Sequence, residues 1–202
     1  MSSPDDAGPE APLREVERLQ HEARGATGLL VLEWSAAAGP DGLRVAYAVR
    51  SAGGGGVYLL DRVVVLAPRD GFAEEPAAAV ALPSPDAPGT LRLLRGYVPA
   101  RRSLPAVELV PGARLLAPGA TLEGTIVVPL PAREWHPADG PHPLPAPPSA
   151  LELRLGVLPL FCALADLALA DGSRIPVPRH ADAHLYQQWL AAPPQPMPAA
   201  AP

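Results

Sequence analysis

Two histidines near the C-terminal end have the spacing of a metal-binding pair. On a helix, His180 and His184 would lie one turn apart on the same face, which is the geometry that zinc sites use. Asp182 would point elsewhere on such a helix and is expected to cap its N-terminus. A third ligand would have to be His136, His142 or an acidic residue from a distant loop. A small zinc-binding protein or metalloenzyme is therefore one alternative, and the other interpretation is a capped, exposed helix start.

The residue patterns of nucleophilic and phosphate chemistry are absent from the sequence. No Gly-x-Ser-x-Gly motif occurs, and the glycines at 53–56 precede neither a helix nor a Lys-Ser/Thr pair, so they predict a hairpin tip. Glu74 and Glu75 lie in a segment expected to be too mobile to tune a pKa. Cys162, the single cysteine, is expected to be a small buried hydrophobe in the run LPLFCAL. We therefore predict no catalytic residue, no cofactor, no bound metal and no enzymatic activity.

The aromatic residue best suited to contacting a partner lies in a proline-rich loop. Trp135, with His136 beside it, is in the segment 129–149, whereas Trp34 and Trp189 are expected to pack in the core or as a lid. Exposed tryptophans are frequent energetic centres of protein interfaces. We predict that Trp135 and His136 contact a protein partner.

Arginines gather around a second turn of the chain. Arg101 and Arg102 follow Arg92 and Arg95 closely in the sequence, and such a basic patch is typical either of a solvated strand end or of an anion or partner site. We include Arg101 and Arg102 among the predicted protein contacts, with the partner unidentified and the oligomeric state open.

The composition limits the class of partner and the compartment. The net charge of −5 argues against nucleic acid as a partner, because phosphate contacts need a clustered basic face. The 202 residues include no lysine and no asparagine, which indicates a very GC-rich, bacterial genome. The acidic start has no apolar stretch of the kind found in secretory signals, and the apolar run 155–165 is interrupted by Pro159 and too short to span a bilayer. We expect a cytoplasmic protein without a membrane span.

A β-hairpin over 42–66 sets the expected fold class. In its first arm Leu43, Val45, Tyr47 and Val49 alternate with polar or small residues, which is the period of a half-buried strand. Its second arm is apolar except for Asp61 and Arg62, and each of these is expected to meet a charge on a neighbouring strand or to lie at the rim. Further alternating segments bring the total to seven to nine short strands, separated by turn signals and without a crossover helix. This predicts an all-β, antiparallel, immunoglobulin-like sandwich, with a closed barrel as the alternative.

The chain divides into one expected domain and two tails. Residues 1–12 and the Pro/Ala-rich residues 192–202 are predicted to be disordered, and 13–191 to form a single domain with a helix over 13–23 and a terminal helical turn over 184–191. The excursions 67–89 and 131–149 lack convincing periodicity apart from AAAVAL, and long loops of this kind often carry function. We therefore expect a non-catalytic binding or accessory module of a GC-rich bacterium. It would act by protein–protein contact through these loops, or by strand addition at a sheet edge.

A family resemblance lies in the order of the strands. A strand, a turn of small residues, an apolar strand ending near Asp61-Arg62 and the later LAPGATLEGTIVVPLP resemble bacterial immunoglobulin-like β-sandwich proteins over residues 28–158. Among these, the chain is similar to the intracellular proteinase inhibitor family of bacilli and its uncharacterised relatives. The resemblance implies a sandwich fold and, as a second alternative, inhibition of an intracellular protease. The long proline-rich loops depart from the compact inhibitor pattern, so no reactive-loop residue is carried over.

Overall fold

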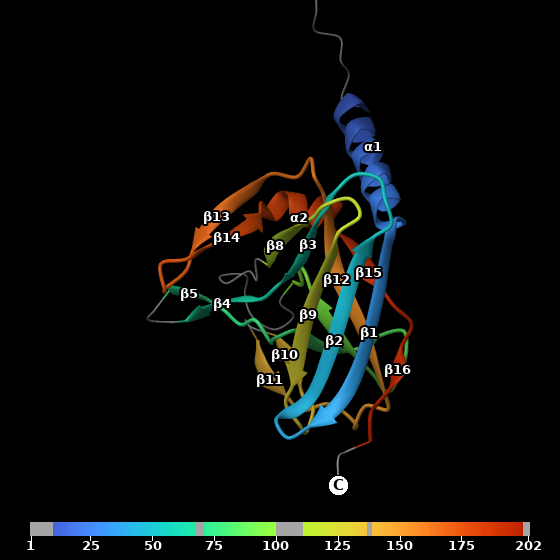
Figure 1. Ribbon diagram of the computed structural model, residues 1–202, viewed down its shortest axis with the longest axis vertical. Helices are drawn as coiled ribbons and strands as arrows, with labels where there is room; N and C mark the ends of the chain where they lie inside the picture. The colour runs from blue at the N-terminus through green and yellow to red at the C-terminus, as the bar shows by residue number, and fades with distance from the viewer. Residues whose placement is uncertain (1–9, 68–70, 100–110, 137–138, 200–202) are drawn as a thin grey trace, which may run out of the picture.

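The computed structural model describes residues 10–67, 71–99, 111–136 and 139–199, and it is mostly β (Figure 1). The predicted arginine pair at 101 and 102 lies outside these ranges. Within them, the helices are α1 (Glu10–Thr27) and α2 (His180–Tyr186). The strands are β1 (Leu30–Gly39), β2 (Gly42–Ser51), β3 (Val57–Arg62), β4 (Val64–Ala67), β5 (Gly71–Glu74), β6 (Val80–Pro83), β7 (Thr90–Arg95), β8 (Gly112–Leu116), β9 (Thr121–Val128), β10 (Glu134–His136), β11 (Gly140–His142), β12 (Ala150–Pro159), β13 (Leu164–Ala168), β14 (Arg174–Pro178), β15 (Gln188–Ala191) and β16 (Gln195–Pro196).

Two sheets face each other across the main core. In the described residues one sheet has the order β1-β2-β9, and the larger has the order β11-β10-β6-β7-β12-β3-β8, with β15 and β16 also paired to β12. Figure 1 shows the smaller sheet lying in front of β12. Val45 and Ile126 from the smaller sheet pack in one buried cluster with Leu93 and Leu153 from the larger one. The predicted all-β class is therefore confirmed, while the finer immunoglobulin-like arrangement stays a prediction.

The alternation that predicted β2 is present in the structure. Leu43, Val45, Tyr47 and Val49 are all at most 4% exposed, and the side chains between them point away from the core. A strand places successive side chains on opposite faces, so a period of two in hydrophobicity becomes a buried face and an open face. β2 pairs antiparallel with β1 on one side and with β9 on the other.

The prediction of a wholly antiparallel, seven- to nine-stranded fold is wrong in two respects. β7 and β12 pair in parallel, from Thr90 opposite Ala150 to Arg95 opposite Leu155. No crossover helix is needed, because the chain between them passes through β9 in the other sheet before returning. The described residues also contain sixteen strands, including β5 and β6 within the predicted loop 67–89. These strands have four residues each, too few for an alternating pattern to stand out.

The N-terminal helix is longer than predicted and docks on the sheets. α1 begins at Glu10, inside the segment expected to be a tail. Its Val16 and Leu19 pack against a second buried cluster that includes Leu158 and Tyr186. Short helices gain most of their stability from such packing of one apolar face. Neither helix in the described part of the chain is both long and apolar enough to cross a lipid bilayer.

The C-terminal segment runs along the structure as a strap. The predicted helical turn over 184–191 is wrong in its second half, because β15 follows α2 at Gln188 and pairs with β12. The predicted disordered tail also contains β16, and the Gln195 side chain there donates a hydrogen bond from Nε2 to the Trp34 carbonyl oxygen of β1 at 2.9 Å. We call residues 188–197 the C-terminal strap (Figure 1). Its proline and alanine content, typical of disorder, hides this role in the sequence.

Candidate functional site

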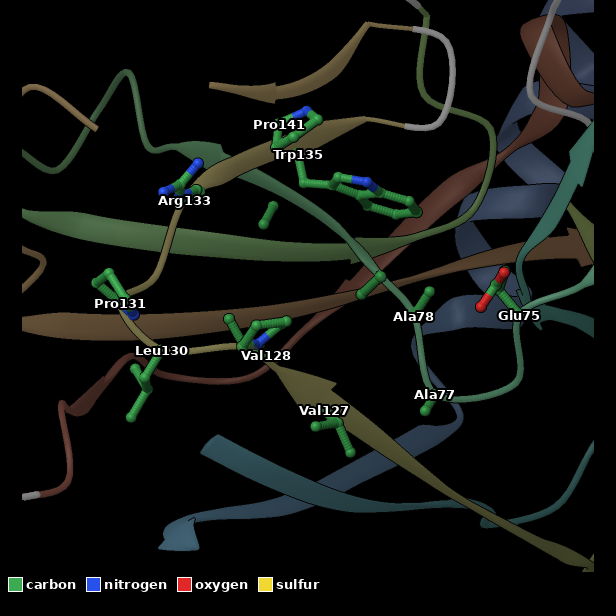
Figure 2. A pocket seen from close by; sticks show the side chains of 13 residues that line it. Glu75, Ala77, Ala78, Val127, Val128, Leu130, Pro131, Arg133, Trp135 and Pro141 are labelled. Carbon is green, nitrogen blue, oxygen red and sulfur yellow. The ribbon is translucent and has the colours of Figure 1, made fainter. Parts of the chain in front are cut away.

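A pocket of about 550 Å³ opens where the two predicted contact loops meet. Its walls come from residues within 75–81, which lead into β6, from residues within 127–135, which join β9 to β10, and from Pro141 of β11 (Figure 2). The loops are distant in sequence and come together because β10 pairs with β6, with Trp135 opposite Ala81. A main-chain hydrogen bond from Val127 N to Ala77 O, at 2.8 Å, joins two of the segments that form these walls.

Trp135 is the aromatic residue among the described residues that line this pocket. Its strand lies between β6 and β11, and the residue is half-buried, in contact with two hydrophobic clusters. The ring therefore has a face supported by the core and another that borders the pocket, the position that aromatic anchors occupy at interfaces. The prediction that Trp135 is a contact residue stays a prediction, and the structure gives it a pocket to act in.

The pocket is apolar along its length and charged at its two ends. Alanine, valine, leucine and proline side chains make most of the lining, and the described residues of this lining include no histidine, cysteine, serine or aspartate. Figure 2 shows Glu75 at one end and Arg133 at the other, with Trp135 between them. In the described part of the chain, neither of these exposed charges belongs to an ion pair. The arrangement can bind apolar surface.

A buried arginine holds the loop that forms one wall. Arg95 is 4% exposed, and its Nε and Nη2 donate to the carbonyl oxygens of Ala78 and Pro76 at 2.8 and 2.7 Å. Nη2 also donates to Thr125 O of β9 at 2.9 Å, and Nη1 donates to Tyr47 Oη at 2.8 Å and Asp61 O at 2.9 Å. The Arg95 guanidinium thus connects residues 76–78, which precede β6, to both sheets through hydrogen bonds. The sequence suggested that Arg95 belongs to a basic patch of the surface. Its burial shows that it does not.

Asp61 completes this buried polar network. Its carboxylate accepts a hydrogen bond from Tyr47 Oη at 2.9 Å and two from Arg114 on β8, one of them at 2.9 Å from Nε. Burial raises the pKa of Tyr47 to about 12, and the hydrogen bond to Asp61 raises the pKa of Arg114. The neighbouring Arg62 forms a two-bond pair with Glu74 of β5. Asp61 thus meets a charge on β8, the strand paired with β3, as predicted, whereas Arg62 meets a charge on β5, which pairs with β4 rather than with β3.

His136 faces the opposite way from Trp135. It is 2% exposed, with Nε2 at 3.0 Å from the Val98 carbonyl oxygen and Nδ1 at 4.0 Å from the Asp139 carboxylate. Adjacent residues of a strand point to opposite faces, so the two could not share one contact surface. The prediction that the His136 side chain meets a partner at the surface therefore does not fit its burial.

The predicted histidine pair comes together on α2. The rings of His180 and His184 are nearly parallel with centroids 6.3 Å apart, and Tyr97 meets each ring edge-on at 5.0 and 6.2 Å. Asp182 does not cap the helix; its carboxylate accepts a hydrogen bond from Ala163 N at 3.1 Å. No cluster of three or more metal-ligating residues occurs among the residues that the structure places. His136 and His142 lie elsewhere, on β10 and β11.

The single cysteine is buried, as predicted. Cys162 is 3% exposed and packs with Leu60, Leu158 and Tyr186. Burial raises the pKa of its thiol to about 12, and the charge of Asp182 acts in the same direction. Because the thiolate is the reactive form, this side chain serves as packing rather than as a nucleophile.

Comparison of the chain with protein-family models, with curated proteins and with solved structures finds no match. The resemblance to intracellular proteinase inhibitors therefore stays a prediction, and the geometry of the pocket carries the functional argument.

Proposed function

We propose that this protein is a non-catalytic binding module that holds an apolar segment of a partner protein in the pocket beside Trp135. The observation that carries the proposal is the convergence of two loops, distant in sequence, on one apolar pocket with an aromatic wall. Pockets that are mostly apolar with a few placed polar groups are the usual form of binding sites. The net charge of −5 makes a protein a better partner than nucleic acid.

The loops are a better binding surface than the two edges of the smaller sheet, β1 and β9. An edge strand can add a partner strand only through free main-chain groups. On β9 the carbonyl oxygens of Glu123 and Thr125 accept hydrogen bonds from Arg114 and Arg95, and Val127 N donates to Ala77 O. On β1 the carbonyl oxygen of Trp34 accepts a hydrogen bond from the Gln195 side chain of the C-terminal strap. Strand addition at either edge would have to displace these bonds.

The wider proposal is an accessory protein of the cytoplasm, with an immunoglobulin-like arrangement of its facing sheets and no enzymatic role. It rests on the composition of the chain and on the all-β architecture. No feature of the described residues favours protease inhibition or a zinc site over this function.

Peptide selection tests the proposal directly. We would select binders from a random dodecapeptide library on the wild-type protein and measure their affinities by fluorescence polarisation for wild type, Trp135→Ala and Leu115→Ala. Leu115 is a 57% exposed leucine outside the pocket and serves as the control. Losing an aromatic anchor costs about 2 kcal/mol or more, so we expect at least a thirtyfold weaker affinity for Trp135→Ala. We expect no change for Leu115→Ala.

A second variant separates loss of the site from loss of the fold. Ala77 is exposed at the pocket, so Ala77→Gln narrows the opening without removing core contacts. It should weaken the same peptides while leaving the urea unfolding curve unchanged. The proposal fails if the library yields no binder, or if the selected peptides bind both pocket variants as tightly as wild type.

A further inference from the structure

We propose that the pocket selects an extended protein segment with a basic side chain at the Glu75 end, an acidic group at the Arg133 end and apolar residues between. This inference rests on the proposed function and specifies the chemistry of the partner. The observation behind it is the placement of two opposite charges at the two ends of an apolar pocket (Figure 2).

Glu75 is held with its carboxylate available to a ligand. Its neighbour Glu74 lies on β5 and is bonded to Arg62. Glu75 follows the strand and is fixed through its main chain, with its N–H donating to Val63 O at 2.8 Å and its carbonyl accepting from Ala78 N at 3.0 Å. These bonds set the turn that brings Glu75 to the pocket wall. Two adjacent acids therefore have different roles, one in an internal ion pair and one at the pocket.

Arg133 is placed at the other end by the segment between β9 and β10. It directly precedes Glu134, which starts β10 and is buried, so the chain is anchored one residue after Arg133. Other arginines of the large sheet have an acidic partner: Arg92 pairs with Glu152, and Arg114 pairs with Asp61. Arg133 has no such partner among the described residues, so its guanidinium can bind a carboxylate in two-bond geometry.

The placement of the two charges at opposite ends of the pocket determines the kind of ligand. A compact apolar molecule would fill the apolar middle of the pocket and leave the charges of Glu75 and Arg133 in water. An extended peptide that placed apolar side chains against Trp135 would continue toward the two ends, where Figure 2 shows Glu75 and Arg133. Because both charges are solvent-exposed, each contact is expected to contribute a factor of about two to five in affinity, which sets selectivity more than total affinity.

The test uses three synthetic peptides that share the apolar centre of a selected binder, acetylated and amidated to remove terminal charges. One carries Lys at one end and Glu at the other, one carries Lys at both ends, and one carries Glu at both ends. With wild type we expect the Lys/Glu peptide to bind about two- to fivefold more tightly than either of the others. This preference should shrink in 1 M NaCl, where charges are screened within about 3 Å.

Charge reversal in the protein should change the preference in a defined way. Glu75→Arg should favour the peptide with two Glu residues, and Arg133→Glu should favour the peptide with two Lys residues. Glu17→Arg on α1 and Arg174→Glu on β14 carry the same changes in net charge away from the pocket and should leave the wild-type order intact.

The outcomes distinguish this inference from the proposed function. If the peptides bind in a Trp135-dependent way but wild type and both reversal variants show the same order, the charge selection is wrong and the pocket remains the binding site. If no peptide binds and only small apolar molecules do, the proposed protein-binding function fails as well.

Discussion

Replacing Arg95 with methionine should destabilise the protein far more than a typical arginine substitution. The side chain is 4% exposed and donates five hydrogen bonds, four to carbonyl oxygens and one to Tyr47 Oη. Methionine has a similar length and no donor, so it fills the space and leaves these acceptors without their partner. Removing one member of a buried charged network costs about 3–5 kcal/mol, and five bonds from one group are not additive. The free energy of unfolding of a domain is about 5–15 kcal/mol, so the loss would be a large part of it.

Urea unfolding followed by tryptophan fluorescence measures this loss. The matched control is Arg174→Met, because Arg174 is 72% exposed and lies 3.9 Å from Asp166, itself 61% exposed. Such surface pairs contribute about 0–1 kcal/mol. If Arg95→Met fails to fold, Arg95→Lys keeps the charge with fewer donors and should show an intermediate loss. If Arg95→Met lowers the free energy of unfolding no more than Arg174→Met does, Arg95 does not hold the residues before β6 to the two sheets.

Two further predictions follow from the raised pKa values. The Cys162 thiol, with a pKa of about 12, should stay unreactive toward Ellman's reagent at pH 8 in the folded protein and react fully in 8 M urea; fast labelling of folded protein would contradict its burial. The pKa of Tyr47 is above its ordinary value of 10, so the folded state holds this proton more tightly, and its contribution to stability is complete below pH 10 and falls as the pH rises toward 12. Urea unfolding at pH 9 and pH 11 should therefore show a larger fall for wild type than for Tyr47→Phe, and equal falls would contradict this.

The strands with enough alternating residues were predictable from the sequence. β2 and β12 each have ten residues in which large apolar side chains recur at every second position, so their hydrophobic period is visible, although β2 buries one face and β12 is buried on both. Strands of three or four residues, such as β6 and β10, form because they find partners in the folded sheet, which a local pattern does not encode. The parallel pairing of β7 with β12 depends on the path of the chain through the other sheet. Only the assembled fold determines that path.

The loops that form the candidate site were predictable from the sequence. The buried hydrogen bonds of Arg95 that hold one of these loops in place were not. The two long excursions and Trp135 pointed to the surface that forms the pocket. The role of Arg95 was missed, although the sequence carried a signal for it. Arg95 follows Leu91 and Leu93 at intervals of two, so it shares their face, and that face is the core. The same rule separates His136 from Trp135. What no local pattern could supply is the set of carbonyl oxygens, from three separate parts of the chain, that receive the guanidinium.

The C-terminal strap has a consequence for the order of folding during synthesis. Gln195 closes onto Trp34, a residue made 161 positions earlier, and β15 and β16 complete the pairing of the central strand β12. A nascent chain therefore exposes the flank of β12 and the edge of β1 until residues 188–197 leave the ribosome. Until then the two sheets present an open seam that chaperones could bind, because unpaired strand edges and uncovered apolar surface invite aggregation.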